Sequence, residues 1–466
     1  WNAGGKNGRG YLFYAGVLEA SMAAGSAAAT VTGDAAGRQL GMWGRDDINH
    51  DGYSDLLGYE SLENYTGRQY LFYGAAGDAP ISGGLISNQA ANTFSGVEDN
   101  EFFELVGTDD VNGDGYADIV ARSRCGGDVG CVYAFLGPDF AAQETSATAD
   151  VTITGAAAGD FFGGTESNVC VADVNGDGIA DIIAGSPVAS AQSGLIQVFY
   201  GGPSLASKSA SAADVTITGD GDLFGSYPFA ADLDGDGRKD IVVPNYNYDS
   251  SRGRVYVFYG ANLASKGAAD ADVILTGENV GDDFSAVETG DVNGDGLTDL
   301  LVGADGYDTD RGRAYVFYGG SGIATKGAAD ANIIYTGNAG DSLEVAPPAD
   351  INGDGIEDII LPRSYSASAQ GKIFIFIGGS GMTSGTVDSA NITLSGEGTT
   401  DGYRFIRTLD VNGDGIADVI AGASRYDSDR GRAYIFYGDV ALSSRTADLA
   451  DVIITGESAN DQFGLF

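Results

Sequence analysis

The sequence contains little histidine, cysteine, proline or basic charge. Its 466 residues include one His, three Cys, nine Pro and 24 Lys plus Arg, against 66 Asp plus Glu. A single His cannot build a multi-histidine zinc site, and it leaves one imidazole for any Ser-His-Asp or Cys-His arrangement. Three Cys are too few for a scaffold held together by disulfides. These scarcities argue against zinc enzymes of the multi-histidine type and against small disulfide-rich folds.

The shortage of basic residues also limits the class of partner. The formal net charge is −42, and binding to phosphates needs clustered Lys and Arg, so neither nucleic acid nor an anionic membrane is expected as the main partner. No stretch of 18 apolar residues occurs, so no transmembrane helix is expected. The first residues, WNAGGKNGRG, do not resemble a signal peptide, so either a signal has been removed or the chain begins within a longer protein.

What the sequence does contain is a repeat. The pattern D-x-[DN]-x-D-G-x-x-D occurs seven times, and successive copies begin 59 to 63 residues apart. The copies begin at Asp47, Asp110, Asp173, Asp232, Asp291, Asp350 and Asp410. Self-similarity at a fixed period of this length indicates supersecondary units that are stacked or arranged radially.

Each period also contains four short apolar runs. An apolar run such as DLLVG follows the nine-residue pattern directly, and a polar loop leads to a run such as RAYVFYG (313–319). A linker then leads to a run such as VTITG (151–155), and a last segment enters the next copy. The runs are β-branched or aromatic, are bounded by Gly, Asp or Ser, and lack a helical period, so they predict strands. Four-stranded units repeated radially predict an all-β fold, a β-propeller with apolar residues on both faces of each blade.

The nine-residue pattern has the oxygen-rich character of a loop that binds a hard cation. Side-chain oxygens at positions 1, 3, 5 and 9 and the carbonyl oxygen at position 7 can surround one ion, and Gly at position 6 permits the sharp turn. The loop is not an EF-hand, because position 12 never carries Glu and the flanking runs are strands rather than helices. The pattern therefore favours Ca²⁺; Mg²⁺ fits less well, because it prefers a smaller shell that keeps several waters.

These features together resemble the FG-GAP repeat family, which forms the propeller of integrin α subunits and occurs in many bacterial surface proteins. In that family an FG pair precedes the calcium loop and a GAP-like turn follows it. The resemblance covers the whole chain; the loop motif is specific, whereas the FG and GAP elements are individually weak. FG is kept at Phe162-Gly163, Phe224-Gly225 and Phe463-Gly464, and the other copies have Leu40-Gly41, Phe103-Glu104, Phe284-Ser285, Leu343-Glu344 and Tyr403-Arg404.

The resemblance implies one Ca²⁺ loop between the first two strands of each blade, about seven ions in all. The implied side-chain ligands at positions 1 and 3 are Asp47, Asn49, Asp110, Asn112, Asp173, Asn175, Asp232, Asp234, Asp291, Asn293, Asp350, Asn352, Asp410 and Asn412. Those at positions 5 and 9 are Asp51, Asp55, Asp114, Asp118, Asp177, Asp181, Asp236, Asp240, Asp295, Asp299, Asp354, Asp358, Asp414 and Asp418. The carbonyl ligands at position 7 belong to Tyr53, Tyr116, Ile179, Arg238, Leu297, Ile356 and Ile416.

The two ends of the chain predict how the ring closes. Residues 40–460 form seven complete repeats of a single propeller that comprises residues 1–466, while 1–39 and 461–466 match parts of one further cassette. We favour seven blades, with the ends belonging to a longer array or pairing with neighbouring chains, which would allow self-association. In the alternative, the ends meet within one ring and close a split eighth blade.

Several single features carry narrower expectations. Cys125 and Cys131 are expected to form a disulfide if the protein is exported, and Cys170 to be a free thiol in a strand. His50 lies at a non-ligand position of the first loop, and we expect no catalytic role for it. The recurring YDSSRGR, YDTDRGR and YDSDRGR segments are expected to pair Asp with Arg inside a hairpin. The loops at 59–67 and 122–130 depart from this pattern and are better candidates for a specific contact.

The function expected from the sequence is that of a secreted or cell-surface, Ca²⁺-stabilised propeller. It would bind a protein or a glycan as an adhesion or recognition module, and it would not be an enzyme. A structural subunit of an extracellular assembly is one alternative. A polysaccharide lyase is the other, although no convergent set of base, acid and basic cleft residues is visible outside the repeats.

Overall fold

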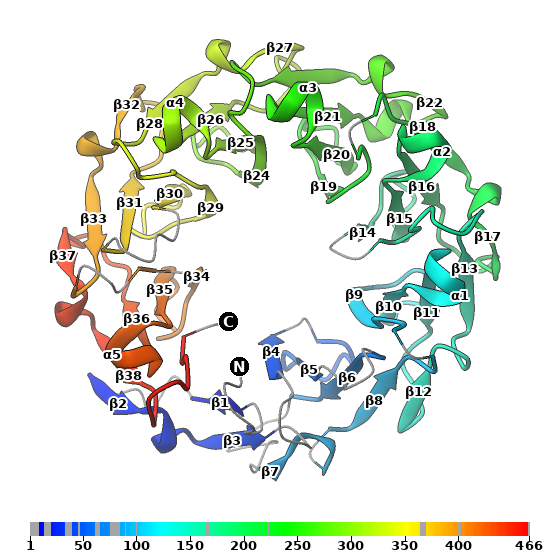
Figure 1. Cartoon of the computed structure of the whole chain (residues 1–466), viewed down its shortest axis with the longest axis horizontal. Coiled ribbons are helices and arrows are strands. Elements are labelled where there is room, and N and C mark those ends of the chain that lie inside the picture. Colours follow the sequence, from blue (N-terminus) through cyan, green and yellow to red (C-terminus); the bar gives the residue numbers. More distant parts are fainter. Residues whose placement is uncertain are drawn as a thin grey trace.

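In the computed structural model, the strands form sheets arranged radially around a central axis (Figure 1). The structure describes residues 9–13, 20–32, 40–44, 47–60, 66–74, 84–88, 90–98, 100–164, 168–221, 223–363, 370–398, 402–403 and 405–464. Seven sheets have five strands each and constitute the complete blades, numbered here in chain order. The predicted β-propeller with seven complete, four-stranded repeats is confirmed.

Four antiparallel strands of each blade come from one cassette, in order from the axis outward. The first strands are β4 (Leu40–Gly44), β9 (Glu104–Asp109), β14 (Val169–Ala172), β19 (Phe229–Ala231), β24 (Phe284–Gly290), β29 (Ala346–Ala349) and β34 (Phe405–Leu409). The second strands are β5 (Leu56–Glu60), β10 (Asp118–Ser123), β15 (Asp181–Ser186), β20 (Asp240–Asn245), β25 (Asp299–Ala304), β30 (Asp358–Pro362) and β35 (Asp418–Ala423). The third strands are β6 (Arg68–Phe72), β11 (Cys131–Phe135), β16 (Leu195–Phe199), β21 (Arg254–Phe258), β26 (Arg313–Phe317), β31 (Lys372–Phe376) and β36 (Arg432–Phe436). The fourth strands are β8 (Asn92–Ser95), β13 (Val151–Thr154), β18 (Val215–Thr218), β23 (Val273–Thr276), β28 (Ile333–Thr336), β33 (Ile392–Ser395) and β38 (Val452–Thr455).

A fifth, parallel strand at the outer edge of each blade was not predicted. It comes from the linker of the following cassette and pairs with the fourth strand. These strands are β12 (Gln143–Thr145), β17 (Lys208–Ser209), β22 (Lys266–Gly267), β27 (Lys326–Gly327), β32 (Gly385–Thr386), β37 (Arg445–Thr446) and β2 (Ser21–Ala23). Single 3-10 turns belong to the same linkers: η2 (Ala24–Ser26), η3 (Ile86–Asn88), η4 (Ala210–Ala212), η5 (Gly260–Asn262), η6 (Ala268–Asp270), η7 (Ala328–Asp330), η8 (Val387–Ser389) and η9 (Ala447–Leu449). The linker therefore joins each blade to the next one.

The core lies between blades. All six residues of β25 are buried, because this strand has a neighbouring blade on either face. β23 instead alternates buried and half-buried residues, as expected of an outer strand. Away from the closure, each hydrophobic cluster combines residues of two adjacent blades; for example, Val257 and Phe284 pack in one cluster with Phe317. Apolar burial thus makes each blade depend on its neighbours.

In blades 2 to 7, the residue at the FG position anchors the blade to the previous one. Phe162, Phe224 and Phe284 are fully buried, and Leu343 and Tyr403 fill the same place in blades 6 and 7. The backbone N–H of Phe284 donates to the carbonyl of Arg252 at 3.3 Å, in the turn of the preceding blade. A large apolar side chain is therefore what the position requires, which explains why its identity varies.

A three-stranded sheet closes the ring between blades 7 and 1 (Figure 1). It consists of β1 (Arg9–Leu12), β3 (Ala29–Thr32) and β7 (Gly84–Leu85). Val31 packs with Tyr70 of blade 1, and the Arg9 Nη1 lies 2.5 Å from Glu457 Oε2, after blade 7. The partial cassette therefore stands within the ring, as in the split-blade alternative, beside the seven complete blades. Residues 1–8, 14–19, 33–39 and 465–466 of the predicted closing segments lie outside the described residues.

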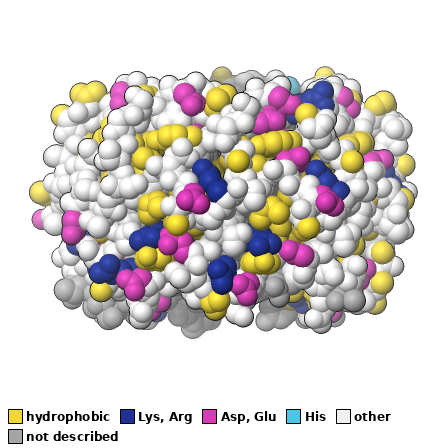
Figure 2. All heavy atoms as spheres, turned by 90° about the horizontal axis from the view of Figure 1, so that it is seen from above, with side chains coloured by type: hydrophobic (Ala, Val, Ile, Leu, Met, Phe, Trp, Pro, Cys, Tyr) yellow, Lys and Arg dark blue, Asp and Glu magenta, His cyan; other side chains and the backbone are white. Residues whose placement is uncertain are grey.

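The two ends of the ring carry different loops. The nine-residue loops join first to second strands at one end, and short turns join second to third strands at the other. These turns are α1 (Cys125–Asp128), α2 (Ala189–Gln192), α3 (Tyr248–Ser251), α4 (Tyr307–Asp310) and α5 (Tyr426–Asp429). On the outer wall, basic side chains lie beside acidic ones (Figure 2). Among the helices that the structure describes, none is long and apolar enough to cross a membrane.

Candidate metal sites and a candidate binding face

In each nine-residue loop the first Asp folds back over the loop. In the loop at 291–299, Asp291 Oδ1 accepts the backbone N–H groups of Gly294 and Asp295, at 2.8 and 3.1 Å. Its Oδ2 accepts the N–H of Gly296 at 2.8 Å. Gly296 has φ +85°, a conformation that glycine adopts without strain. These bonds give the loop its shape and hold the first carboxylate over its centre.

The third and fifth positions complete the same local network. Asn293 Oδ1 accepts the N–H of Asp295 at 2.8 Å, and Asp295 Oδ1 accepts the N–H of Leu297 at 2.9 Å. The amide of Asn293 donates to Asp295 Oδ2 at 3.1 Å and to Asp299 Oδ1 at 3.2 Å. The side chains at positions 3, 5 and 9 therefore converge, with an amide donor between two carboxylates.

The Asp at position 9 is buried and fixes the loop to the blade. Asp299 Oδ2 accepts the N–H of Val292 at 3.1 Å, and Oδ1 accepts that of Gly319, beyond the third strand, at 2.9 Å. Burial raises the pKa of Asp299 to about 6. The same cause gives a pKa of about 6 for Asp118, Asp181, Asp240 and Asp358, and raises the pKa of Asp55 and Asp418. A buried carboxylate with a raised pKa lacks compensating positive charge.

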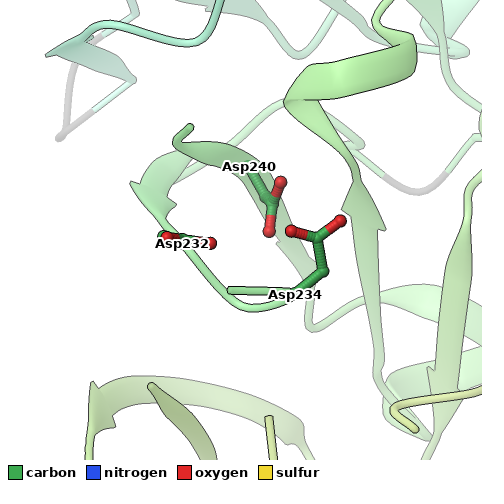
Figure 3. A group of neighbouring side chains, drawn as sticks. All are labelled: Asp232, Asp234 and Asp240. Carbon is green, nitrogen blue, oxygen red and sulfur yellow. The ribbon is translucent and has the colours of Figure 1, made fainter. Parts of the chain in front are cut away.

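The loop at 232–240 concentrates the most negative charge. Asp232, Asp234 and Asp240 point toward one another (Figure 3), with ligand oxygens within 4.8 Å of each other. Asp234 replaces the Asn of the other loops and has no amide to donate. Because a cluster of carboxylate oxygens is the donor set that Ca²⁺ prefers, the residues present fit a calcium ion.

All seven predicted loops are described, and neighbouring loops are linked. The N–H of Lys239, at position 8 of one loop, donates to the carbonyl of Asp173, at position 1 of the preceding loop, at 3.2 Å. Glu357 makes the same bond to Asp291 at 3.3 Å. The side chain at position 7 of one loop also packs against position 4 of the preceding loop. A Cβ on Gly294, in the loop at 291–299, would lie 2.7 Å from Ile356 Cδ1, in the following loop. The candidate metal sites are thus parts of a ring of contacts.

His50 contributes no ligand to its loop in the described geometry. It occupies position 4 with φ +58°, where the other loops have Gly, and its ring lies 5.8 Å from that of Tyr116. Cys170 is a free thiol in β14, as expected, and burial raises its pKa to about 11. Neither residue takes part in a group of potential metal ligands found among the described residues.

At the opposite end, the turns of blades 4, 5 and 7 share one construction. In blade 5 the guanidinium carbon of Arg313 lies 3.7 Å from the ring centre of Tyr307, and its Nη1 is 2.6 Å from Glu278 of the previous blade. Between them Asp308, Thr309 and Asp310 all have positive φ. The predicted Asp–Arg pairs are confirmed: Asp249–Arg252 at 2.8 Å, Asp308–Arg311 at 3.6 Å and Asp427–Arg430 at 3.3 Å.

Blade 2 departs from this construction. Cys125 begins α1 where Tyr307 begins α4, and Cys131 begins β11 where Arg313 begins β26. The two cysteines form the predicted disulfide, which replaces the Tyr–Arg contact of the other blades. The loop at 122–130 is therefore distinctive, as expected. Of the other candidate loop, 59–67, residues 61–65 lie outside the described residues.

Two further residues around this loop were not found from the sequence. Arg122 is 3% exposed, and it forms an ion pair with Glu104 and donates to the carbonyl of Gly164 at 2.6 Å. Glu101 is buried and accepts the backbone N–H of Val97 at 2.5 Å. The only available signal was the break in the recurring YDxxRGR segment, where RSRCGGDVGC stands instead.

Comparison with known proteins agrees with the repeat architecture. The FG-GAP repeat family matches residues 167–199, 224–258, 284–317 and 404–436. Integrin alpha-4 of Xenopus laevis is 32% identical over 187 residues, which cover 38% of this chain and 17% of that protein. Integrin alpha-PS2 of Drosophila melanogaster is 26% identical over 242 residues, or 47% of this chain and 16% of that protein.

One relative is named as an enzyme. Phosphatidylinositol-glycan-specific phospholipase D of Homo sapiens is 28% identical over 194 residues, which cover 38% of this chain and 22% of that protein. These matches thus span less than a quarter of the length of each relative. A solved structure of a eukaryotic initiation factor covers 97% of this chain and 98% of its own at a TM-score of 0.45 and 9% identity, too distant to bear on function.

Proposed function

Because the chain carries FG-GAP repeats and is related to integrin α subunits, we propose that it is a Ca²⁺-stabilised propeller that binds a protein or glycan. It would act as an adhesion or recognition module, secreted or at the cell surface. Fold likeness alone does not decide function, so the proposal depends on the two ends of the ring. One would hold cations and the other would contact the partner.

About seven Ca²⁺ ions would occupy the nine-residue loops. The side chains at positions 1, 3, 5 and 9 and the carbonyl at position 7 would hold each ion, as assigned above. A bound cation would supply the positive charge that the converging carboxylates lack. Its role would be structural, because each loop joins the first strand of a blade to the second and touches the loop of the neighbouring blade.

The observation that carries the binding role is the departure of blade 2 at the opposite end. Blades 4, 5 and 7 repeat one turn, which therefore serves the fold. Blade 2 instead carries a disulfide, the partly exposed Arg124 and, just before its first strand, Phe102, which is 38% exposed. Exposed apolar side chains beside a cation on one blade are typical of a contact surface.

Paired binding screens test the proposal. The full chain, immobilised in Ca²⁺ or in EDTA, is presented to a random-peptide display library and to a glycan array. We expect calcium-dependent binding that is lost when Phe102→Ser is used in place of the wild type, with the exposed Val440→Ser as a matched control. Binding that neither variant affects would place the contact elsewhere, and no binding in either screen would refute the recognition role.

The two alternatives predict other results. A lyase would release unsaturated products from acidic polysaccharides in the presence of Ca²⁺, and such release would replace the proposed role by an enzymatic one. A structural subunit would self-associate, which sedimentation over a range of concentrations measures. Surface biotinylation of the producing cells tests the proposed location.

A further inference from the structure

Arg124 lies between two aromatic rings at the junction of blades 2 and 3. Its guanidinium carbon is 4.8 Å from the ring centre of Phe102, which begins blade 2, and 5.6 Å from that of Phe161, which begins blade 3. A guanidinium is attracted to the face of an aromatic ring. The two rings therefore hold this cation in one place while the side chain remains 32% exposed.

No hydrogen bond from the guanidinium of Arg124 is found within the part of the chain that the structure describes, although its backbone N–H donates to the carbonyl of Glu101 at 2.6 Å. Its Nε is buried without an acceptor, and the carboxylate of Asp128 lies 3.9 Å away, beyond hydrogen-bond distance. By contrast, Arg252 Nε donates to its own Asp249 at 2.8 Å. Among the described residues, Arg124 is thus a positioned cation whose one ion-pair partner, Asp128, is too distant for a hydrogen bond.

The two aromatic residues of the site both have a strained backbone conformation. Phe102 and Phe161 have φ values of +51° and +53°, in the left-handed region that disfavours bulky side chains. The corresponding residues of blades 4, 5 and 6 are Leu223, Asp283 and Ser342, with φ of +65°, +56° and +42°. The turn itself therefore needs no aromatic residue. Two aromatic residues held in a left-handed conformation beside Arg124 are unfavourable for folding, which points to a use in binding.

We propose that Phe102, Arg124 and Phe161 form a binding site for a carboxylate side chain of a protein partner. This rests on the proposed binding function and names its ligand. The planar guanidinium would make paired hydrogen bonds to an Asp or Glu of an extended segment, and an apolar residue beside that acid would lie on the exposed part of Phe102. A polyanion such as an acidic polysaccharide would be repelled by a net charge of −42, whereas a single acid in a neutral or basic segment is not.

Peptides selected from a random dodecapeptide display library on the full chain in Ca²⁺ serve as probes. Their affinities are measured by fluorescence polarisation for the wild type, Arg124→Gln, Arg124→Lys and the control Arg311→Gln. We expect selected sequences to share an acid next to an apolar residue. Arg124→Gln should weaken their binding at least about tenfold, the size of one charge-assisted pair, and Arg311→Gln less than twofold.

The outcomes separate the inference from the proposed function. Peptides that bind Arg124→Gln as well as the wild type, or that lack acids, overturn the carboxylate site and leave a protein-binding role intact. Wild-type affinity in Arg124→Lys overturns the paired geometry, because Lys keeps the positive charge but lacks the planar pair of N–H donors.

Arg124-dependent binding of uronate oligosaccharides on the glycan array assigns the site to polysaccharide instead. No selected peptide at all refutes both; an unchanged melting temperature shows that each variant is folded.

Discussion

The third position of the nine-residue loops separates one loop from the other six. Asn at this position donates to a carboxylate at position 5 or position 9, and Asn293 donates to both. Asp234 cannot donate, and it stands with Asp232 and Asp240 within 4.8 Å. The Asn loops can therefore offset part of their own charge, whereas the loop at 232–240 depends more strongly on a cation.

Exchanging these residues should change cation affinity in opposite directions. Asp234→Asn is expected to weaken Ca²⁺ binding at its loop several-fold, because one carboxylate is lost, and Asn293→Asp to strengthen binding at its own loop by a similar factor. Isothermal titration calorimetry on the full chain measures both. Unchanged affinity in both variants would contradict the assignment of position 3 as a ligand.

Glu288 provides a pH-dependent test away from the loops. Burial on β24 raises its pKa from 4.5 to about 7, against a smaller opposing effect of Arg407. The folded protein keeps this proton above pH 4.5, where the unfolded chain loses it, so folding stability should fall as pH rises from 4.5 to about 7 and then level off.

Replacing Glu288 by Gln removes that ionisation. Glu288→Gln should be more stable than the wild type above pH 7, by at most about 3 kcal/mol, and the difference should vanish below pH 4.5. Urea unfolding at several pH values, in excess Ca²⁺, measures the difference. The exposed Glu98→Gln serves as control, and a constant difference across this range would contradict the burial of the carboxyl group.

Among the structural elements, the turns between second and third strands are the most informative. Blades 4, 5 and 7 close this turn with a Tyr–Arg stack and an ion pair to the preceding blade, and blade 2 closes it with a disulfide at the same two positions. Two unrelated interactions thus perform one task. The task is to hold consecutive residues at positive φ, a conformation that L-residues resist.

Breaking the stack should therefore cost more than the loss of a surface ion pair. Arg313→Met is expected to lower the free energy of unfolding by about 1–3 kcal/mol, because it removes both the contact with Tyr307 and the pair with Glu278. Urea denaturation measures the loss. Tyr307→Ala and the double variant complete a cycle, and strictly additive effects would show that the stack does not couple the two side chains.

The sequence predicted the elements that follow from period and pattern, and it missed those that depend on distant contacts. The apolar runs, the seven loops and the disulfide were all visible. The two-residue strand Lys266–Gly267 carries no β-type signal, and it pairs because the next cassette passes alongside. The left-handed turn at Asp308 to Asp310 contains no Gly. The contact of Arg124 with Phe161 joins two blades, and no local pattern could reveal it.

At the scale of the whole molecule, chelation is the most direct test of the ions. At about 2 mM Ca²⁺ and a Kd of about 0.1 mM, each site would stabilise the fold by about 1.8 kcal/mol. Seven such contributions would be comparable to the stability of an ordinary domain. EDTA should therefore lower the melting temperature by about 10 °C or more, as measured by differential scanning calorimetry. An unchanged melting temperature would mean that the loops are empty under those conditions.

The outer strands also impose an order in time on the formation of the ring. Blades 1 to 6 each receive their fifth strand from a segment synthesised about 50 residues later, as the contacts of Thr216 with Ser265 and of Ile274 with Thr325 indicate. A nascent blade therefore leaves the ribosome with an open edge until its successor emerges. Blade 7 is different, because its edge strand β2 is made near the beginning and must wait for β38. Of the outer strands that the structure describes, β2 comes earliest in the chain and is the last to find its partner, so its pairing with β38 closes the ring.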